Sequence, residues 1–480
     1  MNSSCIVWFR RDLRVDDNPA LSAAASRGAV LPVYIYAPEE EEPWAAGAAS
    51  RAWLHHSLTS LADRLIGLGS GLGVYRGDSL QILKRLIVET NAEALYYNRC
   101  YEPQSLDRDK NIEAALLTQG VEVRSFKAAL IFEPQEVENR AGLPFRVFTP
   151  FYKHCLSRLP AVKATPPPSR LQPPARAFTA PLQIKALGLM PSRPWADSMM
   201  SGWRPGADGA ARELEVFLDS AVDRYPVDRD VPGVRGVSRI SPHLHHGEIS
   251  PRMLLNAVRA VEINGTASER KGAAAFLRQI MWREFAGHLL FHFPFLPTKP
   301  FDRRFRGFSW RTDDVGFSAW KKGQTGYPMV DAGMRELWAT GWMHNRVRMV
   351  VASFLTKHLL VDWVRGARWF WDTLVDADLA NNTLGWQWTA GCGVDPAPYF
   401  RVFNPIAQGE RFDPDGRYVR RWVPELAGLP DRFLHRPFEA GAGVLAKAGV
   451  RLGDNYPLPL VEHKSARERA LAAYDRIRRS

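Results

Sequence analysis

The chain has 480 residues, enough for two hydrophobic cores, and its composition of 46% hydrophobic and 24% charged residues is typical of a globular protein. No apolar run reaches the roughly 18 residues that suggest a membrane span, and charge follows the short apolar stretch at the N-terminus, which argues against a secretory signal. Four scattered cysteines without a CxxC pair argue against a disulfide framework, a zinc site or an iron–sulfur cluster. We therefore expect a cytoplasmic protein without a metal site.

The chain is basic, with a formal net charge of +12. Such a charge favours polyanionic partners, of which nucleic acid is the commonest, although an incidental surface charge is the simpler alternative. The distribution of tryptophan gives further information about function. All but Trp8, Trp44 and Trp53 of the 16 tryptophans lie between Trp195 and Trp422. Tryptophan is usually a core residue, but this concentration suggests a stacking or electron-carrying role as well.

The N-terminal part alternates strand-like and helix-like patterns with short connections between them. Apolar runs predict strands at 5–9, 29–36, 73–75, 94–97 and 121–126. Helical patterns lie near 17–27, 51–68, 79–90 and 105–119. This alternation predicts an α/β domain with a five-stranded parallel Rossmann-like sheet, whose ligands would bind at the carboxyl ends of the strands.

The rest of the chain predicts a proline-rich connection followed by helices. Residues 160–194 are rich in proline and have no periodic pattern, as expected of a linker. Apolar residues at helical spacing then predict helices at 209–222, 249–263, 270–292, 328–340, 343–360 and 365–376. We expect an α/β domain over 1–135, a linker over 136–205 and an all-α domain over 206–480.

The segment FLRQIMWREFAGHLL places a polar and aromatic group on one side of a helix. Gln279, Trp282 and Arg283 fall at positions i, i+3 and i+4, so they share a face. Such a group is costly to bury unless it meets a ligand or a polar partner. The alternative is an interhelical salt bridge with the indole as filler.

A similar group occurs in GWMHNRVRMVVASFL. Asn345, Arg348 and Met349 share a face, while Arg346 points elsewhere. An amide and a guanidinium on one face suit a phosphate or the hydrogen-bonding edge of a ring. His344 beside them is a packing or hydrogen-bonding residue more often than a catalytic one.

Two carboxylates and two hydroxyls complete the candidates. Asp376 and Asp378 suit the ribose or ring N–H groups of a cofactor better than a metal ion, because histidines and further carboxylates are missing around them. Ser238 and Ser241 lie just before a helical pattern, where hydroxyls and free backbone N–H groups can hold phosphate. Alone, they are only a signal for the start of a helix.

Together these segments resemble the photolyase/cryptochrome family, from IVWFRRDLRVDDNPAL at the N-terminus to YFRVFNP near residue 405. Within the family the chain is most similar to microbial class I cyclobutane pyrimidine dimer photolyases, which are carbon–carbon lyases. The resemblance implies an all-α domain that binds FAD and an α/β domain that carries an antenna chromophore. The FAD-binding positions it implies are Tyr225, Ser238, Arg239, Ile240, Ser241, Arg283, Asn345, Arg348, Asp376, Asp378 and Asn382.

The resemblance also implies an electron path and a lesion pocket. Trp386, Trp363 and Trp310 match the chain that carries electrons from the surface to the excited flavin, and Asn382 matches the residue beside flavin N5. The implied partner is UV-damaged DNA, with the dimer flipped out of the duplex, split by an electron from photoexcited reduced FAD, and the electron returned. The implied DNA-contacting residues are Arg229, Gln279, Trp282, Asn345, Arg346, Met349, Trp388 and Arg401.

Two positions depart from the family pattern. Family members that repair cyclobutane dimers often carry glutamate where this chain has Gln279, and an amide can donate a hydrogen bond but cannot share a proton. Glutamine there is also typical of photolyases for the 6–4 lesion, although the paired histidines of that group are replaced here by His344-Asn345. Near Gln104 the acidic residue of folate antennas is absent, and Glu102-Pro103 is closer to deazaflavin binders, so folate, deazaflavin, another flavin or no antenna all stay open.

Two other functions compete with repair. A cryptochrome photoreceptor would bind FAD and signal through a partner; Asn382, the pair Trp282 and Trp388, and the lack of a long C-terminal tail favour the lyase instead. A light-independent nucleotide-binding protein would use only the α/β domain, and the tryptophans argue against it. We expect a monomer that does not bind membranes.

Overall fold

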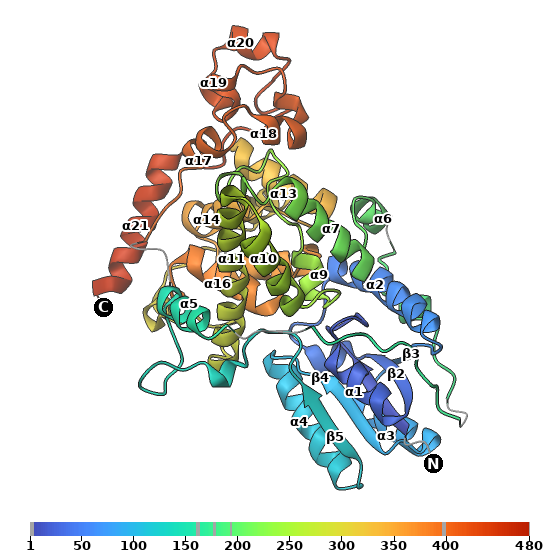
Figure 1. Ribbon diagram of the computed structural model, residues 1–480. Helices are drawn as coiled ribbons and strands as arrows, with labels where there is room; N and C mark the ends of the chain where they lie inside the picture. The colour runs from blue at the N-terminus through green and yellow to red at the C-terminus, as the bar shows by residue number, and fades with distance from the viewer. Residues whose placement is uncertain (1–3, 160–163, 176–178, 193, 396–399, 480) are drawn as a thin grey trace. The chain divides into compact units, whose positions relative to one another are not determined.

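The computed structural model describes residues 4–159, 164–175, 179–192, 194–395 and 400–479 (Figure 1). The chain forms two compact units, each built from separate segments. The first unit contains Met1–Asp223, Ser238–Pro294 and Val375–Ala380, and the second contains Arg224–Val237, Phe295–Leu374 and Asn381–Ser480. The domain boundaries expected from the sequence stay a prediction.

The first unit contains the predicted five-stranded parallel sheet, in the order β3-β2-β1-β4-β5. The strands are β1 Ser4–Phe9, β2 Ala29–Tyr36, β3 Gly73–Arg76, β4 Ala94–Asn98 and β5 Glu122–Phe126. The helices between them are α1 Pro19–Arg27, α2 Ala48–Gly67, α3 Ser79–Thr90 and α4 Pro103–Leu117. Each predicted strand and helix of this region is confirmed to within a few residues.

Helices cover both faces of the sheet, and the central strand β1 is therefore buried on both sides. Val7 and Phe9 pack in one core with Leu21 of α1 and Leu58 of α2. Ile6 and Trp8 point the other way, into a second core with residues of α3 and α4. Alternate residues of a strand point to opposite faces, so a strand that is apolar throughout needs cover on both.

The first unit also contains helices from two other parts of the chain. They are α5 Phe148–Ser157, α6 Trp195–Met200, α7 Ala207–Ser220, α9 Ser241–His245, α10 Pro251–Asn264 and α11 Ala267–His292. The predicted linker therefore contains two helices, although residues 160–163, 176–178 and 193 of that stretch lie outside the described residues. A capping box of Thr266 and Glu269 begins α11, the helix that carries Gln279 and Trp282.

The second unit is helical, as expected. Its helices of eight residues or more are α12 Asp314–Lys322, α13 Pro328–Thr340, α14 Asn345–Ser353, α15 Trp363–Thr373, α16 Leu379–Ala390, α17 Pro405–Phe412 and α21 His463–Arg479, of which α16 begins in the first unit. Its shorter helices are α8 Tyr225–Asp228, α18 Arg417–Trp422, α19 Asp431–Leu434 and α20 Ala442–Lys447, and short 3-10 segments lie between them.

Two helices expected from the sequence are present within a few residues of their expected bounds but differ in detail near their C-terminal ends. The expected helix 343–360 begins at Asn345, widens into π geometry at Phe354–His358, and stops before Leu360, which has a positive φ of 52°. The apolar spacing continues through this change because the π turn still faces the core. The expected helix 365–376 is α15, which ends at Thr373 and leaves Asp376 in the loop before α16.

A glycine of α11 shows how closely the first unit packs. A Cβ added at Gly272 would lie 1.5 Å from the carbonyl oxygen of Val222, so the backbone would have to move. We expect Gly272→Ala to lower the free energy of unfolding by about 1–3 kcal/mol, as overpacking does. Gly443→Ala is the control, because nothing lies within 4 Å of the added atom. Thermal unfolding of both variants tests this; equal melting temperatures would contradict it.

Candidate functional site

A hydroxyl and a carboxylate from distant parts of the chain meet in the first unit. Ser241, the first residue of α9, donates a hydrogen bond of 2.6 Å to Oδ2 of Asp376. His246 lies 3.2 Å from the carbonyl oxygen of Val375 and ties the same two segments together. Asp376 is only 8% exposed, so its carboxylate is directed into the unit. The structure thus brings together two of the motifs that the sequence suggested for a cofactor.

Arg239 has an unusual backbone conformation beside this contact. Its φ is 51°, which is rare for a residue with a side chain. Its guanidinium lies over the ring of Trp203, 4.1 Å from the centroid, and Trp203 in turn packs edge-on against Trp53. The Trp53 indole donates 2.9 Å to Glu248. Sequence analysis missed this support because Trp203 and Trp53 lie outside the motifs.

On α11 the predicted face exists, and Gln279, Trp282 and Arg283 are all half-buried. Trp282 stacks on Phe148 of α5 with centroids 3.6 Å apart and planes 8° from parallel. The Gln279 amide has no hydrogen bond to a described residue, whereas Arg283 donates 2.8 Å to the carbonyl oxygen of Ala129. The face therefore offers a rigid ring and an available amide side by side.

The next residue of α11, Glu284, is a buried acid that sequence analysis did not single out. Its carboxylate accepts hydrogen bonds from the backbone N–H groups of Ile131 and Phe132, at 2.7 and 3.1 Å. Burial raises the pKa of this carboxyl to about 7, and Arg283 and the two N–H groups oppose that rise. Glu284 thereby joins α11 to the segment after β5.

In the second unit, His344 caps α14. Its Nδ1 accepts the backbone N–H of Arg346 at 3.2 Å, which leaves the proton of the neutral ring on Nε2. Glu336 accepts hydrogen bonds from the His344 backbone N–H at 3.4 Å and the Tyr418 hydroxyl at 2.6 Å. His344 is therefore a positioning residue for the start of α14, in agreement with the non-catalytic interpretation.

Because α14 begins at Asn345, the residues Asn345, Arg348 and Met349 keep the helical spacing that was predicted to place them on one face, with Arg346 elsewhere. Asn345 is exposed, and Arg346 turns away to bind Asp230 at 2.8 Å. Arg348 donates 2.7 Å to the carbonyl oxygen of Met343. The remaining predicted contacts of this unit are the half-buried Arg229, Met349 and Trp388, the buried Tyr225 and the exposed Arg401.

The three tryptophans of the predicted electron path all lie in the second unit. Trp386 and Trp363 are each 2% exposed, and Trp310 is half-buried, as a route from the interior to the surface requires. Trp386 packs against Phe370 at 5.0 Å, and a Cβ at Gly366 would lie 2.1 Å from its ring. Beside it, the Asn382 amide donates 3.0 Å to the carbonyl oxygen of Ala367. The electron-carrying role of these rings stays a prediction.

The predicted site residues fall in both units, and their assembly into one flavin and lesion site stays a prediction. In the first unit are Ser238, Arg239, Ile240, Ser241, Gln279, Trp282, Arg283, Asp376 and Asp378. In the second are Tyr225, Arg229, Trp310, Asn345, Arg346, Arg348, Met349, Trp363, Asn382, Trp386, Trp388 and Arg401.

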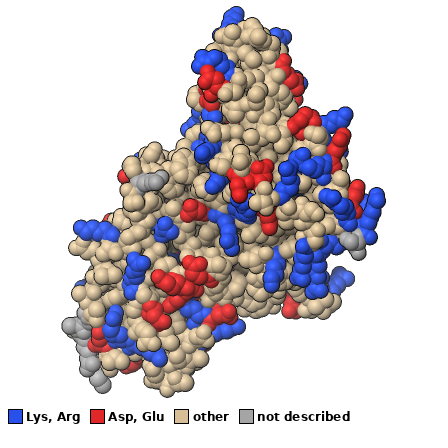
Figure 2. Space-filling view, turned by 180° about the vertical axis from the view of Figure 1, so that it is seen from behind, with Lys and Arg blue, Asp and Glu red and all other residues tan. Residues whose placement is uncertain are grey.

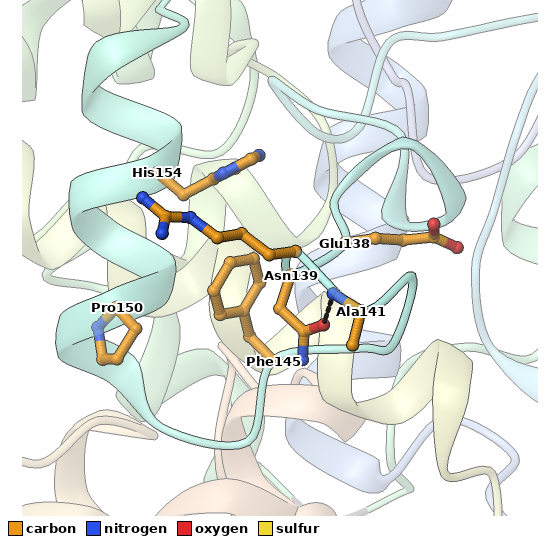
Figure 3. Close-up of a pocket in the computed structure, with 7 residues that line it drawn as sticks. Glu138, Asn139, Ala141, Phe145, Pro150 and His154 are labelled. Carbon is orange, nitrogen blue, oxygen red and sulfur yellow. Dashed lines mark hydrogen bonds between the residues drawn. The ribbon is translucent and has the colours of Figure 1, made fainter.

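The surface offers two further observations. A shallow hollow of about 620 Å³ lies beside α5, lined by Glu138, Asn139, Arg140, Ala141, Phe145, Pro150 and His154 (Figure 3). On the face shown in Figure 2, groups of Lys and Arg side chains lie among groups of Asp and Glu side chains. Within the described part of the chain, no cluster of His, Cys, Asp and Glu could hold a metal ion. No helix of the described residues is long and apolar enough to cross a membrane.

Comparisons with known proteins decide the family. Residues 5–172 match the model for DNA photolyase, and residues 276–476 match the FAD binding domain of DNA photolyase. A deoxyribodipyrimidine photo-lyase of Agrobacterium fabrum is 46% identical over 99% of this chain and 98% of its own length. The chain belongs to the DNA photolyase/cryptochrome family. This confirms the resemblance and the fold class.

The relatives of this chain include cryptochromes as well as photo-lyases. Cryptochrome-2 of Arabidopsis thaliana is 40% identical over 100% of this chain and 80% of its own length. A crystal structure of a bacterial class III photolyase from Agrobacterium tumefaciens has a TM-score of 0.94 and 46% identity, covering 100% of this chain and 98% of that one. We expected the greatest similarity to class I photolyases, and this neighbour belongs to class III instead.

The residues of this photolyase-family chain fit FAD, the cofactor of its matched domain. The buried Asp376 carboxylate and the Ser241 hydroxyl suit the polar groups of a nucleotide. The antenna stays open. Glu102, which suggested a deazaflavin, is paired with Arg11 at the carboxyl edge of the sheet.

The cap of α14 predicts a pH dependence. Burial lowers the pKa of His344 to about 4 from 6.5, with Asp230 opposing and Arg346 adding to the shift. Because the folded protein disfavours the proton, the contribution of His344 to stability is complete above pH 6.5 and is lost as the pH falls toward 4. His344→Asn keeps a capping side chain that does not titrate there. We expect the melting temperature of the unmodified protein to fall relative to that of H344N over this range; a constant difference would contradict the prediction.

Proposed function

We propose that this protein is a light-dependent DNA photolyase that uses FAD to split cyclobutane pyrimidine dimers. One observation carries the proposal: Trp282 lies flat against Phe148, 3.6 Å away, with the Gln279 amide on the same helix face. A fixed indole ring beside a hydrogen-bonding amide suits an extruded base, which stacks on aromatic rings and presents carbonyl groups. The family match and the basic charge of the chain agree with a nucleic-acid substrate.

The chain's own residues would bind, orient and shield the lesion. Photolyases act on a flipped nucleotide, and a dimer pairs and stacks poorly, so its extrusion costs less than that of normal bases. Trp282 and Trp388 would stack on the extruded dimer, and Gln279 would donate a hydrogen bond to a thymine carbonyl. Arg229 and Arg401 would contact phosphates, which position the DNA without reading its sequence.

Other residues would serve the cofactor. Bound in its reduced form, FAD supplies the photoexcited electron that opens the dimer. Ser241 and Asp376 would hold its polar groups, and Asn382, whose Nδ2 is fixed on Ala367, would place its amide oxygen beside the ring. Trp310, Trp363 and Trp386 would carry electrons from a reductant at the surface to the flavin and so restore its reduced state.

A cryptochrome photoreceptor is the second candidate, favoured by the 40% identity to Arabidopsis cryptochrome-2. Asn382 argues for repair, since plant-type cryptochromes resembling this chain usually carry aspartate there. The deciding experiment is blue-light repair of dimer-containing oligonucleotides by the purified, reduced protein, with a dark control. Loss of dimers only in the light supports the photolyase. If the protein binds FAD but the dimers stay intact in the light, the photoreceptor function is favoured instead.

The Gln279 amide predicts a lower quantum yield of dimer repair than a carboxyl group at the same position would give. A protonated carboxyl can give a proton-sharing hydrogen bond to the dimer radical anion, whereas the Gln279 amide can donate a hydrogen bond but cannot share a proton. We expect Gln279→Glu to raise the quantum yield of repair while FAD content stays constant. Gln324→Glu, which changes an exposed glutamine of the second unit, is the control. An unchanged or lower yield in Q279E would rule out this role.

The tryptophan path predicts a separation of two activities. Trp386→Phe removes a buried oxidisable ring of the path, so photoreduction of oxidised FAD should lose most of its rate. Repair by chemically reduced protein should not change, because that step needs no electron from the surface. Trp422→Phe, at a half-buried position outside the path, is the control. Transient absorption of the flavin measures the first activity and dimer loss the second.

A further inference from the structure

We propose that Arg278 and Lys271 contact the phosphate backbone of the damaged strand beside the lesion, on a surface that α5 and α11 form together. This inference rests on the proposed function, because it takes Trp282 as a wall of the lesion pocket. Neither cation was among the residues that the family resemblance implied. The two residues extend the DNA contact along α11, away from the lesion.

The first observation is the spacing along α11. Lys271, Ala275, Arg278 and Trp282 stand at i, i+4, i+7 and i+11, so they form one stripe along the helix. Arg278 lies one turn from Trp282, and Lys271 lies two turns further toward the start of the helix. Both cations are exposed, and the small Ala275 leaves the surface between them open.

The second observation is how Arg278 is held. Its guanidinium lies over two rings of α5, 4.9 Å from the centroid of Phe148 and 5.2 Å from that of Tyr152. Phe148 and Tyr152 are stacked on each other, 5.7 Å apart, and Phe148 also stacks on Trp282. Arg278 and the lesion-pocket tryptophan are therefore oriented by the same ring, Phe148, which is 1% exposed.

The third observation is charge. No described carboxylate lies within ion-pair distance of Arg278 or Lys271, whereas Arg346 and Arg420 are paired with aspartates. An exposed guanidinium held over aromatic rings keeps its donors free for an anion. Two cations that lie along one stripe, which ends at a flat ring, suit a nucleic-acid strand, whose phosphates repeat beside its bases.

The salt dependence of DNA binding tests this directly. Removing one cation that binds a phosphate should reduce the slope of log affinity against log salt by about 0.9 for duplex DNA, measured from about 50 to about 200 mM salt. We expect that reduction for Arg278→Gln and for Lys271→Gln on a dimer-containing duplex, and about twice as much for the double variant. Arg278→Lys should keep the slope, because the charge stays.

Two further variants isolate the role of position. Arg85→Gln is the matched control, since Arg85 is also an exposed arginine over a tyrosine ring, 5.9 Å from the centroid of Tyr75, but on α3. Its slope should equal that of the unmodified protein. Tyr152→Leu keeps the charge and removes a ring that holds it, so affinity should fall with an unchanged slope. FAD absorbance and melting temperature should not change in R278Q.

The outcomes separate the two proposals. If the unmodified protein binds and repairs dimers while R278Q keeps the full slope, as R85Q does, the backbone contact is refuted and the photolyase assignment stands. If the protein binds damaged DNA with the predicted slopes but repairs nothing in the light, the contact stands and the repair function fails. If it does not bind DNA, both fail.

Discussion

The hydrogen bond from the Ser241 hydroxyl to the Asp376 carboxylate joins segments 135 residues apart in the first unit. A buried carboxylate is unfavourable unless partners compensate its lost hydration. Ser241 supplies such a partner at 2.6 Å, and His246 anchors the neighbouring Val375. The loop between α15 and α16 is thereby held against α9, and the candidate cofactor groups of both segments are fixed in one place.

Contacts with aromatic rings compensate a second unfavourable feature of the site, the backbone conformation of Arg239. Arg239 is held in a strained backbone conformation, and the cost is compensated by the contact of its guanidinium with Trp203. Trp203 rests on Trp53 of α2, so a residue of the α/β fold stabilises a residue of the candidate flavin site. Phe148 of α5 likewise stabilises Trp282 of α11 by stacking on it. Rigid rings suit this role because they lose little conformational entropy on burial.

In the second unit, a chain of hydrogen bonds sets the start of α14. Tyr418 donates to Glu336, Glu336 accepts the backbone N–H of His344, and His344 accepts that of Arg346. Burial keeps the imidazole neutral, because its pKa is lowered to about 4. A neutral ring is what a cap requires, since a protonated Nδ1 could not accept a hydrogen bond. These hydrogen bonds thereby fix the start of the helix whose first residue is the exposed Asn345.

The α/β sheet, the helical second part and the family could be predicted from the amino-acid sequence, because strand and helix periodicity and long motifs are local properties of the chain. Gln279 and Trp282 could likewise be placed correctly on one face of α11, since helix geometry alone fixes that. Three features could not be predicted in this way: Phe148, from the expected linker, stacks on Trp282, Trp203 supports Arg239, and the helix expected over 343–360 changes to π geometry. Those features depend on contacts between residues far apart in the chain, and no local spacing encodes such contacts.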